Sequence, residues 1–216
     1  MGDLKILTVC NEAYVNIMVC LIQTLEKYHP ELPVEMVALN LSQNSKNKFS
    51  NMHSNLSFVD DYYSDFLNFE EERAYCESCR TWNIKRILKE SDFNVFYIDG
   101  DVYLEDHIDE LLEFFKTVDF CARMKSENPK YRFNAGMIYV KNTEKNINII
   151  EEWEKSTLTH GWVWLSAQNE LGNTLQKFRN DVIVKTFPNK FNGIYTNKES
   201  VIVHMKGPEK KKRINR

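Results

Sequence analysis

Short apolar runs alternate with stretches of helical spacing along much of the chain. An apolar run of about four to eight residues between turn residues is typical of a buried strand, and recurrence every three or four residues is typical of a helix. We predict strands at residues 4–10, 34–39, 56–59, 94–98, 120–124, 136–140, 182–184 and 201–204. We predict helices at residues 13–28, 71–90, 109–115, 143–155 and 163–178, and a polar loop with a weak helix at residues 40–55.

Strands that alternate with helices predict an α/β fold, with a mixed, mostly parallel central sheet flanked by helices. The 216 residues suit one domain with a sizeable core, so we expect a single domain over residues 1–216. In such sheets, ligands bind beyond the carboxyl ends of the strands. Reactive residues that follow a strand are therefore the first candidates for a site.

The composition narrows the class of protein. A formal net charge of −3 gives no reason to expect nucleic acid or a membrane surface as partner. No apolar run approaches the roughly 20 residues that span a bilayer, and the first residues have a strand pattern instead of a signal peptide. Five cysteines without disulfide-like spacing indicate reduced thiols, with Cys76 and Cys79 in the core. We expect a cytoplasmic protein, or a domain from a longer anchored chain.

Two carboxylates follow the apolar strand at residues 94–98: Asp99 and Asp101, with Gly100 between them. Carboxylates this close repel one another unless a cation lies between them, and Mg²⁺ and Mn²⁺ prefer oxygen ligands. Gly100 has no side chain to obstruct a ligand. The triplet predicts a metal site that can also hold a diphosphate. A surface turn is one alternative, and a phosphatase of the haloacid-dehalogenase type, with Asp99 as nucleophile, is another.

Three further positions carry candidate chemistry. Near the C-terminus, residues 204–210 follow the spacing H-x-x-G-x-x-K; a neutral imidazole is a good Mn²⁺ ligand, and a lysine can neutralise a diphosphate. Asn134 precedes the strand at residues 136–140 and offers a donor and an acceptor to sugar hydroxyls. Arg80 lies on an otherwise apolar helix face, which indicates either a structural ion pair or contact with a bound anion.

With these motifs the sequence resembles glycosyltransferase family 8 and its relatives of the GT-A (Rossmann-like) fold, such as glycogenin and the bacterial lipopolysaccharide galactosyltransferases. The resemblance covers residues 4–210, and four motifs match in order: residues 8–14, 99–101, 134–136 and 204–210. The chain also resembles transferase domains of large chlorella viruses that glycosylate capsid protein. That narrower likeness implies viral glycosylation in the host cytoplasm.

The family resemblance implies a role for each matching position. The residues expected to bind Mn²⁺ or Mg²⁺ are Asp99, Asp101 and His204. Those expected around a UDP-sugar, with Tyr14 stacked on the base, are Thr8, Val9, Asn11, Tyr14, Arg80, Asp99, Gly100, Asn134, Gly207 and Lys210. Those expected to act in the reaction are Asn134, Gln168 and Lys210. Residues 1–105 would form the nucleotide-binding half, and residues 106–216 the acceptor half with the C-terminal metal and diphosphate segment.

The implied activity is metal-dependent transfer of a hexosyl unit from a UDP-sugar to a hydroxyl of a glycan or glycoprotein, with retention of anomeric configuration. The sequence shows no obvious carboxylate nucleophile, so we expect front-side attack assisted by the leaving phosphate, with Gln168 as a positioning dipole. Ala167 stands before Gln168 where the family has Asp. This departure leaves a second class open, namely a binding module for sugar nucleotides or glycans that lacks turnover.

Overall fold

Strands and helices alternate through the first half of the chain, as expected. The computed structural model describes residues 3–62, 68–124, 133–161, 163, 165–191 and 200–205. Its strands are β1 (Leu4–Asn11), β2 (Val34–Leu39), β3 (Leu56–Asp61), β4 (Asn94–Ile98), β5 (Val102–Leu104), β6 (Phe120–Met124), β7 (Phe133–Val140), β8 (Val184–Lys185) and β9 (Ile202–His204). Its helices are η1 (Glu12–Tyr14), α1 (Val15–Tyr28), α2 (Gln43–Ser50), α3 (Phe69–Glu90), α4 (Asp109–Phe115), α5 (Glu144–Leu158), α6 (Ser166–Lys177) and η3 (Asn189–Phe191).

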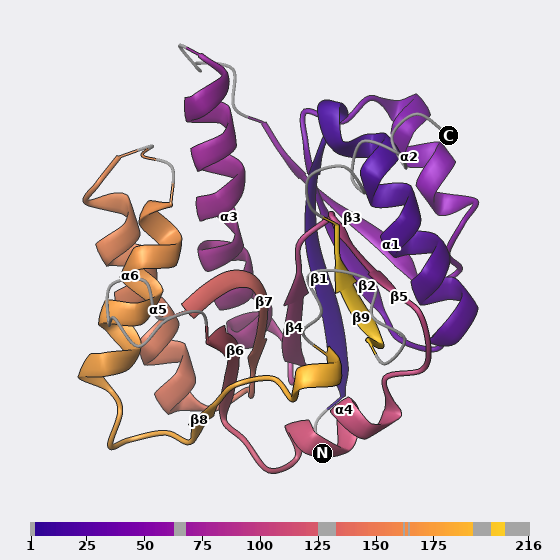
Figure 1. The fold of residues 1–216 in the computed structure, drawn as a ribbon. Helices are drawn as coiled ribbons and strands as arrows, with labels where there is room; N and C mark the ends of the chain where they lie inside the picture. Colours follow the sequence, from indigo (N-terminus) through magenta and orange to yellow (C-terminus); the bar gives the residue numbers. More distant parts are fainter. Residues whose placement is uncertain are drawn as a thin grey trace.

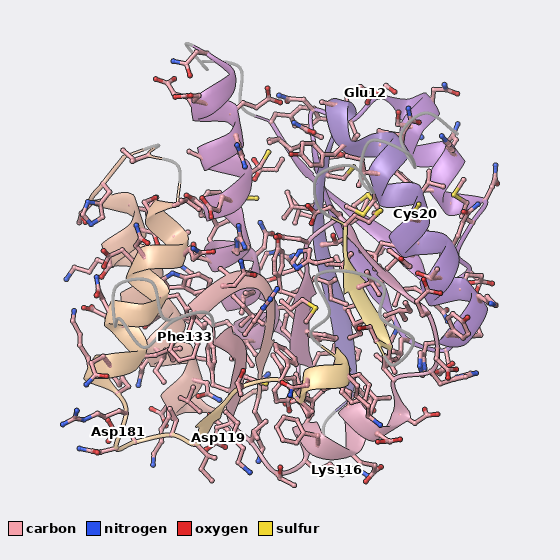
Figure 2. The ribbon with its side chains drawn as sticks, viewed as in Figure 1. Glu12, Cys20, Lys116, Asp119, Phe133 and Asp181 are labelled. Carbon is pink, nitrogen blue, oxygen red and sulfur yellow. The ribbon has the colours of Figure 1, made fainter. Side chains whose placement is uncertain are left out.

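Within the described ranges, seven strands form the central sheet in the order β3-β2-β1-β4-β7-β6-β8, and β5 pairs with β9 in a separate two-stranded sheet (Figure 1). Neighbouring strands from β3 to β4 are parallel, β7 is antiparallel to both β4 and β6, and β8 is parallel to β6. Glu12 follows β1 at one edge of the sheet, and Asp119 precedes β6 at the opposite edge (Figure 2). The carboxyl ends of β1, β4 and β6 therefore share one edge.

Helices cover both faces of the sheet (Figure 1). On one face, α3, α5 and α6 pack against residues such as Leu7 and Tyr97; on the other, α1 and α4 pack against residues such as Ile6 and Phe96. Because both faces are buried, the central strands carry apolar side chains toward both faces and lack a regular polar alternation. This three-layer arrangement confirms the predicted mixed, mostly parallel α/β fold.

Side-chain caps set where several helices begin. The side chains of Ser42, Asn68 and Thr143 accept backbone N–H groups three residues later and so begin α2, α3 and α5. Such caps satisfy donors that have no partner inside the helix. The cap at Ser42 makes residues 43–50 a regular helix, where the polar composition had indicated only a weak one.

Most predicted elements are confirmed, with some shifted ends: α5 runs to Leu158 instead of residue 155, and β8 covers Val184–Lys185 instead of residues 182–184. Residues 102–104 were given no element but form β5, a strand too short for a periodic signal, which exists through its pairing with β9. Strand β7 begins at Phe133, three residues before the predicted start, and α6 begins at Ser166 instead of residue 163. The sequence at these positions lacks a local signal because their partners are distant along the chain.

Two predictions from composition can be compared with the described part of the chain. No helix there has the length and apolar character needed to cross a membrane. All five cysteines have free thiols, with Cys10, Cys79 and Cys121 buried. Burial raises the pKa of the Cys76 thiol to about 12, so this thiol is protonated at neutral pH and unreactive.

Trp153 joins α5 to α6 and gives the first prediction. Its ring is fully buried, and its indole Nε1–H donates to the carbonyl of Ala167 at 2.7 Å. Trp153→Phe removes this bond and part of the packing, so the free energy of unfolding should fall by about 1–3 kcal/mol in urea denaturation. Leu158→Ala on the same helix, with Leu158 45% exposed, should change it by less than about 0.5 kcal/mol. Equal losses in the two variants would contradict this role for Trp153.

Candidate functional site

The backbone after β4 turns sharply and fixes the position of the two carboxylates. The N–H of Asp99 donates to the carbonyl of Gly136 on β7 at 2.8 Å, and the N–H of Val102 donates back to the carbonyl of Asp99 at 3.1 Å. Asp101 then leads directly into β5. The Asp99 and Asp101 side chains are 31% and 20% exposed, so both can reach a ligand from solvent.

Pairing of β5 with β9 brings His204 to this turn. Val102 lies opposite His204 in the ladder, and the N–H of Met205 donates to the carbonyl of Asp101 at 2.7 Å. The Nε2 atom of His204 lies 3.1 Å from Asp101 Oδ1 and 4.0 Å from Asp99 Oδ2. Single ligand atoms of these three residues all lie within 4.8 Å of one another, and no other such group occurs in the described part of the chain. Two carboxylates and an imidazole at this spacing can hold one divalent cation.

The three residues surround a position that has no side chain. A Cβ atom on Gly136 would lie 2.6 Å from Asp99 Oδ2, 2.6 Å from His204 Cε1 and 3.0 Å from Asn134 Oδ1. Unbonded atoms do not normally approach a Cβ this closely, so any other residue at position 136 would force Asp99, His204 or Asn134 to shift. The backbone of β7 is thus one wall of the candidate metal site.

A buried arginine and a tyrosine both contact the same oxygen of Asp99. The Tyr97 hydroxyl donates to Asp99 Oδ1 at 2.6 Å, and Arg80 Nη1 lies 3.6 Å from the same oxygen. These contacts leave Oδ2 directed toward His204. Desolvation opposes the charge on Arg80, but electrostatic interactions with Tyr97, Asp99 and Glu77 together raise the guanidinium pKa above its usual value. Burial also raises the pKa of Tyr97, which therefore remains a hydrogen-bond donor.

Arg80 also makes contacts that the sequence left open. It donates to the carbonyls of Glu77 and Ala135, and its guanidinium lies over the Tyr97 ring, 5.0 Å from the centroid. The ion pair with Asp99 places the Arg80 guanidinium next to the candidate metal site. The structural ion pair expected as one alternative is therefore present.

Asn134 and Gln168 lie beside the candidate metal site. The Nδ2–H of Asn134 donates to Oε1 of Gln168 at 3.1 Å, and Asn134 Oδ1 accepts the N–H of Gly136 at 3.0 Å. Gln168 is only 6% exposed, on the first turn of α6. The two amides predicted from separate motifs are thus in direct contact, and Asn134 lies two residues before the glycine at the metal site.

The residues expected around a nucleotide lie at the carboxyl end of β1. Asn11 Nδ2 donates to Glu72 Oε1 at 2.8 Å, and its buried Oδ1 atom has no hydrogen-bond partner. Val9 and Tyr14 are partly buried. Thr8 is fully buried, and its hydroxyl donates to Met18 Sδ at 3.7 Å, so this hydroxyl is not exposed to a ligand.

Gly100 has a packing role that the sequence did not indicate. A Cβ atom on Gly100 would lie 2.5 Å from the end of the Met18 side chain and 3.9 Å from the carbonyl of Val9. The glycine therefore lets the turn after β4 pack closely on α1, beside the end of β1. Gly207 and Lys210 lie outside the described residues, so their expected contacts remain predictions.

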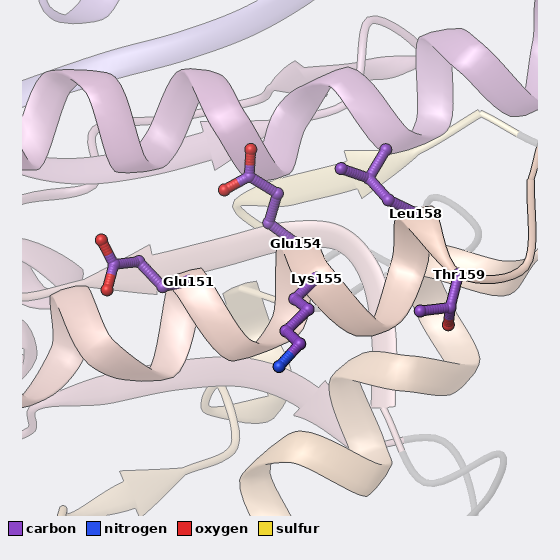
Figure 3. Close-up of a pocket in the computed structure, with 5 residues that line it drawn as sticks. All are labelled: Glu151, Glu154, Lys155, Leu158 and Thr159. Carbon is purple, nitrogen blue, oxygen red and sulfur yellow. The ribbon is translucent and has the colours of Figure 1, made fainter.

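A surface depression on α5 is separate from these residues. Glu151, Glu154, Lys155, Leu158 and Thr159 line it (Figure 3). Glu151 and Glu154 form ion pairs with Lys89 and Lys85 of α3. The depression thus lies along the contact between α3 and α5, where these ion pairs join the two helices. Its lining contains none of the expected site residues.

Comparison with known families decides among the alternatives. The sequence model of a family described as nucleotide-diphospho-sugar transferase matches residues 43–215. The chain belongs to this family. No curated protein sequence gives a significant match. Membership of the family favours the transferase interpretation of Asp99 and Asp101 over the phosphatase alternative.

Solved glycosyltransferases share the fold of this family member. The glycosyltransferase GlyE of Streptococcus pneumoniae is 15% identical, with a TM-score of 0.64, over 97% of this chain and 56% of GlyE. The bifunctional WbbM is 12% identical, with a TM-score of 0.65, over 99% of this chain and 50% of WbbM. Galactosyltransferase LgtC, solved with donor and acceptor sugar analogues, is 14% identical, with a TM-score of 0.62, over 95% of this chain and 88% of LgtC.

At these identities the likeness shows the fold, and it confirms the expected GT-A architecture. The chain spans about half the length of GlyE and WbbM. The viral resemblance stays a prediction.

Sequence reasoning missed two supporting residues, Tyr97 and Glu77, and did not identify the packing role of a third, Gly136. Tyr97 could have been found, because residues two apart on a strand point to the same side and Asp99 follows at that spacing. Gly136 was noticed only as part of a motif. Its closeness to Asp99 and His204 depends on the antiparallel pairing of β4 with β7, which has no local signal.

Gly136 gives the second prediction. Gly136→Ala forces Asp99 and His204 apart, so binding of Mn²⁺ should weaken by about tenfold or more in isothermal titration calorimetry, while the circular dichroism spectrum keeps its native form. Gly161→Ala is the matched control: a Cβ there meets nothing within 4 Å, and the change costs only the strain of a positive φ. Mn²⁺ affinity that is equal in the two variants would show that the cation binds elsewhere.

Proposed function

We propose that this protein is a metal-dependent, retaining hexosyltransferase that moves a hexosyl unit from a UDP-sugar to a hydroxyl of a glycan or glycoprotein acceptor. The observation that carries the proposal is the convergence of Asp99, Asp101 and His204 at the carboxyl edge of the sheet. Family membership supports a nucleotide-diphospho-sugar as donor. The choice of hexose and of uridine comes from the matching motifs in the sequence.

The donor set fits Mn²⁺, since it combines two carboxylate oxygens with one imidazole nitrogen. A Mn²⁺ or Mg²⁺ ion held there would act as a Lewis acid that stabilises the leaving diphosphate. Arg80 lies under Asp99 and adds positive charge to the same region. We place Gly207 and Lys210 at the diphosphate as well, on the H-x-x-G-x-x-K spacing alone.

The nucleotide is proposed to lie over the end of β1, within residues 1–105. Asn11 offers a buried oxygen without a partner, and Glu72 fixes the orientation of that amide. Val9 and the ring of Tyr14 are accessible in part at the same edge. Gly100 brings this edge close to the turn that carries Asp99 and Asp101, so one ligand can contact both.

The acceptor is proposed to approach from the half formed by residues 106–216. The bond between the sugar carbon and the diphosphate oxygen breaks, a bond from that carbon to the acceptor oxygen forms, and the acceptor proton passes to the leaving phosphate oxygen. Gln168 and Asn134 present amide dipoles to the reacting sugar and position it. The role of Gln168 follows from the resemblance to the family's motif and from its contact with Asn134.

A binding module without turnover is the second candidate, and one observation favours it. Ala167 occupies the position before Gln168 where the resemblance implies Asp, and it is fully buried. Mixing the protein with UDP-sugars and Mn²⁺ separates the two functions. Release or transfer of sugar supports the transferase, and tight binding without turnover supports the module.

Asp101 gives the third prediction. Asp101→Asn keeps the shape of the side chain but removes a charge from the cation site, so Mn²⁺-dependent binding of UDP should weaken by about tenfold or more in calorimetry. EDTA should have the same effect on the wild-type protein. Asp92→Asn changes an exposed residue before β4, at the opposite edge of the sheet, and should leave UDP binding intact. UDP binding that survives both Asp101→Asn and EDTA would overturn the metal site.

Gln168 gives the fourth prediction. Gln168→Ala should lower kcat for UDP-sugar turnover by roughly tenfold or more, with little change in UDP affinity, because the amide acts on the reacting sugar. Gln176→Ala changes an exposed residue on the same helix and should leave kcat unaltered. If Gln168→Ala instead weakens UDP binding and spares kcat, the residue belongs to the nucleotide side.

A further inference from the structure

Glu77 of α3 lies between the two sides of the site, and none of the motifs includes it. Its side chain is only 12% exposed. One oxygen, Oε1, lies 3.7 Å from Nη2 of Arg80, and the other, Oε2, accepts the backbone N–H of Leu165 at 2.7 Å. Burial raises the pKa of Glu77, while Arg80 and the Leu165 N–H act in the opposite direction.

Leu165 is the N-cap residue directly before α6, and its backbone is strained. It has a φ of 67°, in the left-handed region, and no side chain caps the helix. A non-glycine residue in that region costs about 1 kcal/mol or more, so the surroundings must hold it there. The bond to Glu77 satisfies its N–H, and a carboxylate beside a helix N-terminus also interacts favourably with the helix dipole.

The start of α6 matters because it positions the acceptor-side amides. The carbonyl of Leu165 accepts the N–H of Asn169 in the first helical turn, which contains Gln168. Gln168 contacts Asn134, and Asn134 supports Gly136 at the metal site. On its other side, Glu77 faces the guanidinium that pairs with Asp99. A single carboxylate thus contacts both the residue under the metal site and the start of the helix with Gln168.

We propose that Glu77 is a positioning residue, which holds the start of α6 so that Gln168 faces the sugar bound at the Asp99 side. The proposal rests on the transferase function proposed above. Helix α3 then has two separate roles: Arg80 supports Asp99, and Glu77 holds the start of α6. Arg80 would remain in place without the Glu77 side chain, because it also donates to the backbone carbonyls of Glu77 and Ala135. Loss of the carboxylate should therefore affect the reaction step more than donor binding.

The test compares Glu77→Ala with Glu77→Gln, in which the amide oxygen can still accept the Leu165 N–H. Probes are UDP-glucose and UDP-galactose with Mn²⁺, and the readouts are kcat, the Kd of UDP and hydrogen exchange of the Leu165 amide. In Glu77→Ala we expect exchange at Leu165 to accelerate by about tenfold or more and kcat to fall by about tenfold or more, with the Kd of UDP within about threefold of wild type. In Glu77→Gln all three should return to within about threefold of wild type.

Controls separate this proposal from folding defects and from the proposed function. Glu90→Gln changes an exposed residue on the same helix, and exchange in α1 reports any global loss of stability. Unchanged Leu165 exchange in Glu77→Ala, kcat retained in that variant, or Glu77→Gln as defective as Glu77→Ala would each overturn the role of Glu77. A wild-type protein that neither binds UDP with Mn²⁺ nor turns over either sugar nucleotide overturns the proposed function, while Leu165 exchange still reports on the Glu77 contact.

Discussion

The candidate site depends on one short pairing, between β5 and β9. Strand β5 has three residues, and it follows Asp101 without a loop. Its ladder with β9 sets Val102 opposite His204 and so fixes the imidazole against both carboxylates. Without this pairing, Asp99 and Asp101 are two acidic groups on a turn, and neither their number nor their geometry favours one particular cation. Ile17 of α1 packs with Tyr103 of β5 and Val203 of β9, so the two-stranded sheet is held against helix α1.

Charge balance around Asp99 organises the region beneath that pairing. Tyr97 and Arg80 both contact Oδ1, which leaves Oδ2 for a ligand. A buried guanidinium is costly unless anionic partners compensate it, and Asp99 and Glu77 supply that compensation from opposite directions. Stability and function are therefore linked here: the same ion pairs that make a buried arginine acceptable also orient the ligand oxygen and reach the start of α6.

The sequence predicted the architecture well because both sheet faces are buried. Strands β2 and β4 are buried along their whole length and mostly apolar, and their bounds match the predicted ones. Asp99 and Asp101 stand out at the end of β4. The resemblance added His204, which composition alone could not connect to them. The sequence could not predict contacts between residues that are far apart in the chain. Strand β5 is too short to show a periodicity of its own, and Asn134 meets Gln168 only through tertiary packing of two elements. A motif match also does not show that a side chain is accessible: Thr8 lies within a matching motif but is fully buried.

The order of the ligands along the chain has a consequence for biosynthesis. The turn with Asp99 and Asp101 leaves the ribosome soon after the parallel strands that support it, whereas His204 follows 105 residues after Asp99. Domains commonly begin to fold from the N-terminal side during synthesis. The parallel part of the sheet can then assemble while the third ligand is still missing, and a nascent chain has no complete cation site until β9 has emerged and paired.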